Sequence, residues 1–285
     1  MSVALRRVVV RLLHDPSLVA RVFEGGAVPE LSDDELRMLR AVDRRAFGTD
    51  PLRPARVLQA LLEELPVASA VAAGGRPAAR LLSFFQSPEF HAAVMRGDPL
   101  WLAYAQWLAP RAAPWLAPPV TEGSTAPIGS ERPALPTVGA GPFVLLEAAI
   151  ARARRWRGPP GPGSLGAVRL ADGCWPVLLP DQTVSRWQFV RQRLGADPVG
   201  TLARGVDLSG APRPGVGSEC VVVVTGSGGD RLEYGAAGLH PALTLAQRRT
   251  DHASLLATLV AQGADDEEAA VVLAQMFDDG WLVAE

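Results

Sequence analysis

The residues best suited to acid–base chemistry in this chain are four histidines. His14, His91, His240 and His252 all stand outside GxSxG, HExxH and Cys–His patterns. A catalytic base must lie near its reacting partner, and such patterns are how residue spacing reveals one. His91 has no carboxylate or second histidine at ligand spacing, so we interpret it as a structural or surface histidine. Spacing identifies no catalytic set, and we expect no enzyme activity from this chain alone.

The acidic clusters and the cysteines favour structural roles. Asp33–Glu35 and Asp265–Glu268 each precede an apolar helical stripe, where carboxylates cap a helix and interact with its dipole. Cys174 and Cys220 are too few for a disulfide framework, and they belong to no CxxC or Cys/His cluster. We therefore expect two semi-buried thiols and neither a metal nor another cofactor bound by this chain.

Residues 250–285 predict a helix, a second helix and a terminal strand. Asp251 is a suitable cap for the first helix, Asp265–Glu268 form the acidic first turn of the second, and Trp281–Val283 are short and apolar. Two helices and one strand cannot enclose a core. This segment must pack on upstream strands, which predicts a winged-helix-like arrangement.

Four upstream segments are predicted strands. Cys220–Thr225 is β-branched and apolar on both faces, as in the middle of a sheet, whereas Arg231–Tyr234 alternates like a half-buried strand. The two are joined by a glycine-rich turn. Ala167–Leu170 and Trp175–Leu179 flank a turn sequence and predict another hairpin. Between these pairs, Thr183–Leu194 predicts a helix.

The punctuation of the chain predicts two domains. Residues 1–115 contain repeated helix starts, such as Asp15-Pro16, Ser87-Pro88 and the capping-box pattern of Ser32 and Glu35. Residues 116–141 are rich in proline. We therefore predict a mostly α, α+β protein: an irregular helical bundle over 1–115, a proline-rich linker over 116–141, and a winged-helix-like α+β domain over 142–285 with a small antiparallel sheet.

The aromatic residues between 84 and 107 allow two interpretations. Trp and Tyr are favoured anchors at protein interfaces, so a partner-docking face is one possibility. Aromatic residues at helical spacing are more often buried, so the core of the bundle is the other. The candidates for docking are Phe85, Phe90, Trp101 and Tyr104.

Composition and charge exclude several classes of protein. The formal net charge is −2, the pI is about 6.1, and all 28 basic residues are arginines. No basic excess favours binding to nucleic acid or anionic lipid. Arg6, Arg7 and Arg11 interrupt the apolar start, and no apolar run approaches the roughly 20 residues of a membrane span. We expect a cytoplasmic protein without membrane or nucleic-acid partners.

Two groups of patterns resemble known proteins of peptide maturation. The N-terminal group contains Leu36-x-x-Leu39, Asp43-x-Arg45-Ala46-Phe47, Asp50-Pro51-x-Arg53-x-x-Arg56, Leu61-Leu62-Glu63-Glu64-Leu65-Pro66 and Phe84-Phe85-x-Ser87-Pro88-x-Phe90. It resembles the partner subunits of multinuclear non-haem iron oxidative enzymes, which modify ribosomally made peptides (RiPPs), as in the methanobactin and 3-thiaglutamate pathways. Residues 255–260 and 269–283 resemble a RiPP recognition element, a small winged-helix-like domain that takes up a leader peptide as an added strand.

This resemblance implies a non-catalytic accessory subunit. Iron would belong to a separate enzyme subunit in a heterodimer, and this chain would bind the precursor's leader and raise its effective concentration at the enzyme. Strand pairing would set the register, and apolar side chains would provide selectivity. Which strand edge is free stays open, with the hairpin's second strand favoured. The implied peptide-binding residues are Arg231, Leu232, Glu233, Tyr234, Ala270, Leu273, Ala274 and Phe277.

Two other functions compete with peptide binding. A winged helix also occurs in DNA-binding regulators, here with an N-terminal sensor bundle. The predicted recognition helix, residues 265–279, carries six acidic residues and no basic one, so it would repel phosphates. We rank DNA binding below peptide binding for this reason. A scaffold without any peptide ligand is the third hypothesis.

Overall fold

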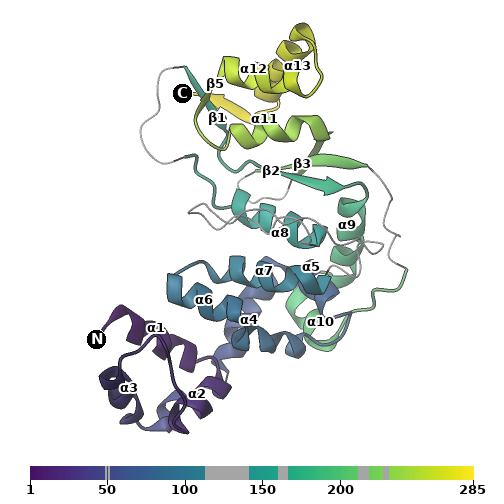
Figure 1. The fold of residues 1–285 in the computed structure, drawn as a ribbon. Coiled ribbons are helices and arrows are strands. Elements are labelled where there is room, and N and C mark those ends of the chain that lie inside the picture. Colours follow the sequence, from purple (N-terminus) through teal and green to yellow (C-terminus); the bar gives the residue numbers. More distant parts are fainter. Residues whose placement is uncertain (49, 51, 113–140, 160–165, 211–217, 227–230) are drawn as a thin grey trace, which may run out of the picture. The chain divides into compact units, whose positions relative to one another are not determined.

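The computed structural model describes residues 1–48, 50, 52–112, 141–159, 166–210, 218–226 and 231–285. The chain divides into two compact units, which Figure 1 colours along the sequence. The N-terminal unit comprises Met1–Val144 and Trp187–Ala211, and the C-terminal unit comprises Leu145–Arg186 and Pro212–Glu285. Helices predominate and the strands are antiparallel, which confirms the predicted mostly α, α+β class. None of the helices within the described ranges has the length and apolar character that a bilayer crossing requires.

The N-terminal unit is built from short helices. They are α1 (Val3–Leu12), α2 (Pro16–Phe23), α3 (Asp33–Arg40), η1 (Arg44–Phe47), α4 (Arg53–Glu64), α5 (Pro66–Ala72), η2 (Ala78–Gln86), α6 (Pro88–Arg96), α7 (Leu100–Ala112) and α10 (Pro198–Arg204). Asp15 and Ser87 cap α2 and α6 as predicted, and Ser32 and Glu35 form the predicted capping box of α3. Two further helices, α8 (Pro142–Ala153) and α9 (Thr183–Leu194), each contain residues of both units.

An aromatic cluster forms the centre of the N-terminal unit. The ring of Phe84 lies within 5.6 Å, centroid to centroid, of the rings of Phe85, Phe90, Tyr104 and Trp107. All five side chains are at most 2% exposed. Tilted and edge-to-face contacts of this kind add to the stabilisation from apolar burial. The hydroxyl groups of Tyr104 and Ser69 lie 3.0 Å apart, so the polar end of the tyrosine is also satisfied inside the core.

Residues 187–211 belong to the N-terminal unit, which differs from the predicted domain boundary at residue 142. The Val206 N–H donates to the Gly75 carbonyl at 2.8 Å, and Leu202 on α10 is fully buried. Gly75 has φ +71°, and a Cβ there would lie 2.4 Å from the Val206 carbonyl oxygen, so the approach requires glycine. Spacing along the sequence could not reveal this return. Residues 113–140, which include all of the predicted linker except residue 141, lie outside the described residues.

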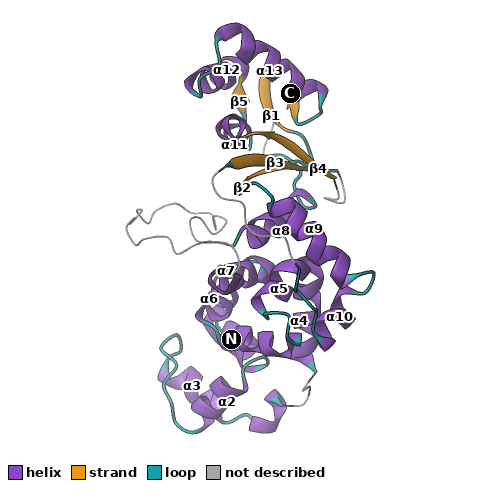
Figure 2. Cartoon of the chain, turned by 90° about the vertical axis from the view of Figure 1, so that its right-hand side faces the viewer, coloured by secondary structure: helices purple, strands orange, loops and turns teal. Residues whose placement is uncertain are grey.

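The C-terminal unit contains two three-stranded antiparallel sheets, drawn in orange in Figure 2. The strands are β1 (Ala167–Leu170), β2 (Trp175–Pro180), β3 (Glu219–Thr225), β4 (Arg231–Ala236), β5 (Thr250–Asp251) and β6 (Leu282–Ala284). One sheet has the order β5-β1-β6, and the other has the order β2-β3-β4. The predicted pairing of β3 with β4 is confirmed, with Cys220 opposite Ala236 and Thr225 opposite Arg231.

The predicted hairpin between β1 and β2 is wrong, because these strands belong to different sheets. β1 pairs with β5 and with the terminal strand β6, and Arg169 lies opposite Val283. Backbone hydrogen bonds extend this pairing, since the Glu285 N–H donates to the Ala167 carbonyl at 2.8 Å. The terminal strand thus obtains its partner from a remote upstream segment, which local alternation cannot predict.

Residues 250–285 contain the predicted two helices and terminal strand, and the short strand β5, which was not predicted, precedes them. α11 (His240–Leu245), β5, α12 (His252–Ala261), α13 (Asp266–Asp278) and β6 follow one another, while β1 supplies the middle strand. Asp251 caps α12, and Asp265 and Glu268 form a capping box on α13. Leu255, Leu259 and Leu273 share a buried core with Val221 and Val223 of β3. The hairpin β3–β4 therefore supports the C-terminal helices, as the sequence predicts.

Candidate functional site

Strand β4 lies at an edge of its sheet. Within the described residues it pairs with β3 alone. Alternate backbone N–H and C=O groups of an edge strand point away from its neighbour and remain available to another chain. Its residues are exposed or half-buried, and Tyr234 is 58% exposed. Four of the predicted peptide-binding residues, Arg231 to Tyr234, thus lie on an accessible strand edge.

The two faces of β4 have different surroundings. Glu233 and Gly235 lie opposite Val223 and Val221, so they share the sheet face that packs on the C-terminal core. Leu232 and Tyr234 point to the other face. A chain added to β4 would meet both kinds of surroundings at alternate residues.

A hydrogen bond anchors β4 beside the end of α13. The indole N–H of Trp281 donates to Glu233 Oε2 at 2.6 Å, and the Thr225 hydroxyl donates to Glu233 Oε1 at 3.0 Å. Trp281 comes shortly after α13 and is only 5% exposed. A bond from a buried indole to a carboxylate is charge-assisted, and here it links β4 to the segment that follows α13. The importance of Trp281 was missed in the sequence, where it is simply the first apolar residue of a strand.

Helix α13 exposes only some of the side chains that the sequence predicted to contact a peptide. Leu273 is fully buried in the core, so its predicted role in peptide binding is wrong. Phe277 is half-buried, packs against the same core, and stacks on His252 with ring centroids 6.5 Å apart. Ala270 and Ala274 are exposed. The structure connects α13 to β4 through Trp281 rather than through the side chains predicted from the apolar stripe.

The predicted docking face of the N-terminal unit is closed. Phe85, Phe90 and Tyr104 are at most 1% exposed and belong to the aromatic cluster, so their predicted role in docking is wrong. Trp101 on α7 is half-buried. Aromatic side chains on several short helices stabilise the unit most when they meet one another away from water. The core interpretation of this aromatic run is the correct one for these three residues.

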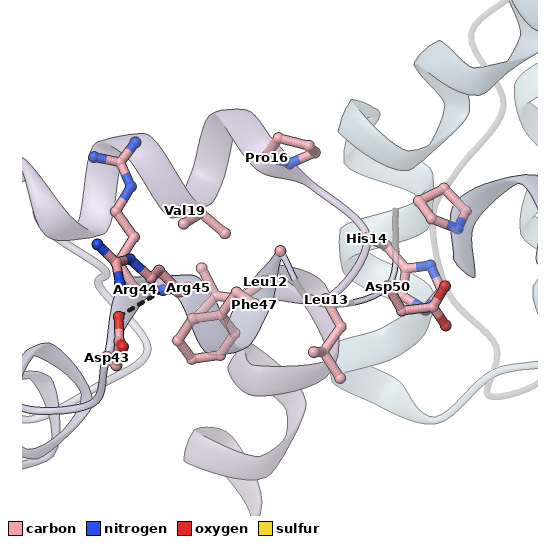
Figure 3. Close-up of a pocket in the computed structure, with 12 residues that line it drawn as sticks. Leu12, Leu13, His14, Pro16, Val19, Asp43, Arg44, Arg45, Phe47 and Asp50 are labelled. Atoms are coloured by element: carbon pink, nitrogen blue, oxygen red, sulfur yellow. Dashed lines mark hydrogen bonds between the residues drawn. The ribbon is translucent and has the colours of Figure 1, made fainter. Parts of the chain in front are cut away.

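A cavity of about 580 Å³ opens in the N-terminal unit among α1, α2 and η1. Figure 3 shows its apolar residues Leu12 and Phe47 between two polar ends, with Arg44 at one end and His14 beside Asp50 at the other. Asp43, Arg45, Phe47 and Asp50, which belong to the N-terminal resemblance, all line this cavity. Arg44 and Arg45 are exposed at its rim.

The two acidic residues of this cavity already have partners. Asp43 accepts a hydrogen bond from the Arg45 backbone N–H at 2.9 Å, and Asp50 contacts Arg56 and Arg53. Burial, followed by the nearby charge of Arg53, lowers the pKa of His14. The ring of His14 stacks on Phe85 at 5.3 Å. The cavity therefore combines an apolar interior, a neutral imidazole and a basic rim.

His91 has charged partners that are remote in the sequence. Its Nε2 lies 3.1 Å from Asp15 Oδ2, its Nδ1 lies 3.3 Å from the Arg11 guanidinium, and Arg11 pairs with Glu30 at 2.6 Å. Burial alone would raise the pKa of Asp15, but bonds from His91, the Ser17 hydroxyl and the Leu18 N–H outweigh it and lower that pKa. Asp15 is 2% exposed, so this network joins α1, α2 and α6 rather than facing a substrate.

The cysteines and acidic residues show no arrangement for redox or metal chemistry within the described ranges. Burial, followed by the charges of Glu233 and Asp172, raises the pKa of the Cys174 thiol to about 11. A thiol with this pKa is a poor nucleophile at neutral pH. Of the residues that the structure describes, no three His, Cys, Asp or Glu side chains gather as a metal site would require.

Comparison with known proteins gives no family for this chain. No protein-family model, no curated protein and no solved structure matches it. The function is therefore argued from the geometry of the chain itself.

Proposed function

We propose that this chain binds the leader of a ribosomally synthesised precursor peptide and delivers it, in the cytoplasm, to a separate multinuclear non-haem iron enzyme. The observation that carries this proposal is the edge of β4, which has no second strand beside it within the described residues. It contains no proline, so each of its residues keeps a backbone N–H. Addition of a leader segment to this edge would satisfy those groups.

The surroundings of β4 support a specific rather than a general contact. A peptide strand presents its side chains alternately to the two faces of the sheet. On one face these side chains would lie near Glu233 and the buried Trp281, and on the other near the exposed ring of Tyr234. Backbone pairing sets the register, and the two faces discriminate between sequences.

Delivery requires a second surface, and the cavity lined by Leu12 and Phe47 supports docking of the enzyme subunit there. Its lining includes four residues of the pattern that resembles the partner subunits of iron enzymes. An apolar interior with an exposed arginine rim suits a partner segment that carries apolar and acidic side chains. Arg44→Glu with Arg45→Glu should weaken co-purification of the iron enzyme and leave peptide binding unchanged.

Binding at the β4 edge is tested by hydrogen exchange with precursor peptides encoded beside this gene. At a peptide concentration of about 100 times Kd, the outward-facing amides of β4 should exchange about 100-fold more slowly. Neighbouring residues of a strand point their N–H groups to opposite sides, so Glu233 and Tyr234 differ in this respect. Residues two apart in a strand share the direction of their N–H groups. Proline should therefore be placed at Tyr234 if its N–H exchanges quickly in the free protein, and at Arg231 if that of Glu233 does, because both side chains are exposed and neither anchors β4 to Trp281. Either proline should reduce affinity at least about tenfold.

Two outcomes would contradict the proposal. Protection confined to the N-terminal unit would remove the leader from β4. Sequence-specific retention of DNA in a mobility-shift assay at low salt would favour the regulator instead. The acidic first turn of α13, formed by Asp266, Glu267 and Glu268, argues against that second outcome because it repels phosphate groups.

A further inference from the structure

A second cavity of the N-terminal unit has a different chemical character. Its volume is about 570 Å³, and its lining includes Arg76, Arg80 and Arg111 together with Ser83 and Trp107. These arginines come from three places: the segment after α5, the helix η2, and the end of α7. Among the described residues that line the cavity there is no carboxylate. Three positive charges thus surround one space without a lining group of opposite charge.

Arg111 is held in place by its own helix. Its Nη1 donates to the Trp107 carbonyl at 2.6 Å, and its guanidinium lies 3.9 Å from the centroid of the Trp107 ring. Trp107 is only 2% exposed, so the ring is a fixed platform. Cation–π contact and hydrogen bonding together orient the guanidinium. Ligand binding would then order this side chain at little further entropic cost.

Arg76 and Arg80 are exposed, and neither forms an ion pair with a described residue. Two other exposed arginines of this unit are paired: Arg37 contacts Asp34 at 2.7 Å, and Arg96 contacts Asp98 at 2.6 Å. The carbonyl groups at the end of α5 are not hydrogen-bond partners for the side chains of Arg76 and Arg80. The Val71, Ala70 and Ala73 carbonyls already accept hydrogen bonds from the backbone of residues 74–76.

We propose that this cavity binds a compact polyanion that carries a diphosphate group. The planar fork of arginine matches phosphate oxygens and can donate two parallel hydrogen bonds. Three guanidinium groups balance the roughly three negative charges that a diphosphate carries at neutral pH. The volume falls within the range of about 300–1,000 Å³ that is usual for small-molecule sites. The site is independent of β4 and of the proposed peptide binding.

Calorimetric titration of the whole chain with inorganic pyrophosphate at low salt tests this site. Binding should be measurable and should weaken as salt is raised. Arg76→Gln and Arg80→Gln should each reduce affinity about tenfold, because each removes charge-assisted bonds to the ligand. Arg96→Gln is the matched control, since that arginine is exposed and already paired, and it should leave affinity unchanged.

Arg111→Gln distinguishes the cavity from general surface attraction. It should also weaken pyrophosphate binding, and circular dichroism should show an intact fold. Hexaglutamate should not displace pyrophosphate, because an extended acidic peptide cannot place several charges in one compact space. Absent pyrophosphate binding, equal loss in Arg96→Gln, or displacement by hexaglutamate at lower concentration than pyrophosphate itself would each overturn the proposal.

Discussion

The aromatic cluster of the N-terminal unit and strand β4 of the C-terminal unit differ in what they leave accessible. Phe84, Phe90 and Tyr104 are fully buried, and the Tyr104 hydroxyl has its partner in Ser69. Tyr234 on β4 is 58% exposed, and one edge of its strand is unpaired within the described residues. Both regions contain residue types that favour protein contacts. An unpaired strand edge, rather than the presence of aromatic side chains, therefore distinguishes a candidate binding surface from a core.

The two edges of the sheet β2-β3-β4 extend this comparison. β2 contains Pro176 and Pro180, which lack an N–H, and most of its side chains are buried. Prolines and coverage are common ways of protecting an edge from unwanted pairing. β4 has neither protection over Arg231–Ala236. One edge is closed to another chain by its sequence, while the other keeps its donors and acceptors.

The largest effect that sharpens the comparison is expected in the aromatic cluster. Phe84→Ala should lower the free energy of unfolding by about 3–5 kcal/mol, because it leaves a cavity among four other aromatic rings. Urea-induced unfolding followed by circular dichroism measures this change. Leu82→Ala is the matched control on the same helix, since Leu82 is 38% exposed and should change stability much less. Equal losses in the two variants would break the distinction between a closed cluster and an open surface.

The second-largest effect is expected when acid protonates Asp15 in the N-terminal unit. The pKa of Asp15 lies below its ordinary value of 3.8, so its carboxylate stabilises the fold fully at pH values above 3.8. This stabilisation is lost as pH falls through the lower pKa of the folded state. The loss should amount to about 1.5–3 kcal/mol, the range usual for hydrogen bonds to a charged group. Urea unfolding at a series of pH values from about 7 down to about 2 measures it.

Asp15→Asn provides the control for the acid prediction. Asparagine keeps the helix cap but cannot ionise, so the variant should lose the steepest part of the acid dependence. His14 acts over a higher range, because its lowered pKa makes stability fall as pH drops from 6.5 toward the folded value. That earlier loss should persist in Asp15→Asn. An unchanged acid limb in the variant would show that Asp15 is not the responsible group.

Helices and strands could be predicted from neighbouring residues in the sequence, whereas contacts between residues far apart in the sequence could not. The β-branched run of 220–225 predicted β3, and the cap at Asp265 predicted the start of α13, because both depend on neighbouring residues. The prediction that Leu273 binds a peptide was wrong, because the apolar stripe of a helix does not show whether it packs against the core or against a partner. The bond between Glu233 and Trp281 joins residues 48 positions apart. No spacing rule could reveal it.

The pairing of β1 with β6 and the arginine cavity were missed for the same reason. A turn sequence after Leu170 favours a hairpin between β1 and β2. Only the folded structure shows that β1 pairs with β6 instead. Arg76, Arg80 and Arg111 are each ordinary surface arginines in the sequence. Their convergence depends on how α5, η2 and α7 pack.

The smallest effect is expected at the anchor of β4, and it links the open edge to the core. Trp281→Phe keeps an aromatic ring but removes the indole N–H, and Glu233→Gln keeps an acceptor but removes the charge. Each should lower the free energy of unfolding by about 1 kcal/mol. In a double-mutant cycle the coupling should be about 0.5–1.5 kcal/mol, because both changes weaken the same 2.6 Å hydrogen bond.

The cycle also tests whether the anchor positions β4 for a peptide. If it does, Trp281→Phe should reduce peptide affinity by less than proline in β4 does, since the backbone donors remain but the strand is held less firmly. Thr225 continues to donate to Glu233 in that variant, so the strand keeps one support. Additive losses of stability, with peptide affinity unchanged, would mean that Trp281 fills the core and that the edge of β4 is positioned by its pairing with β3 alone.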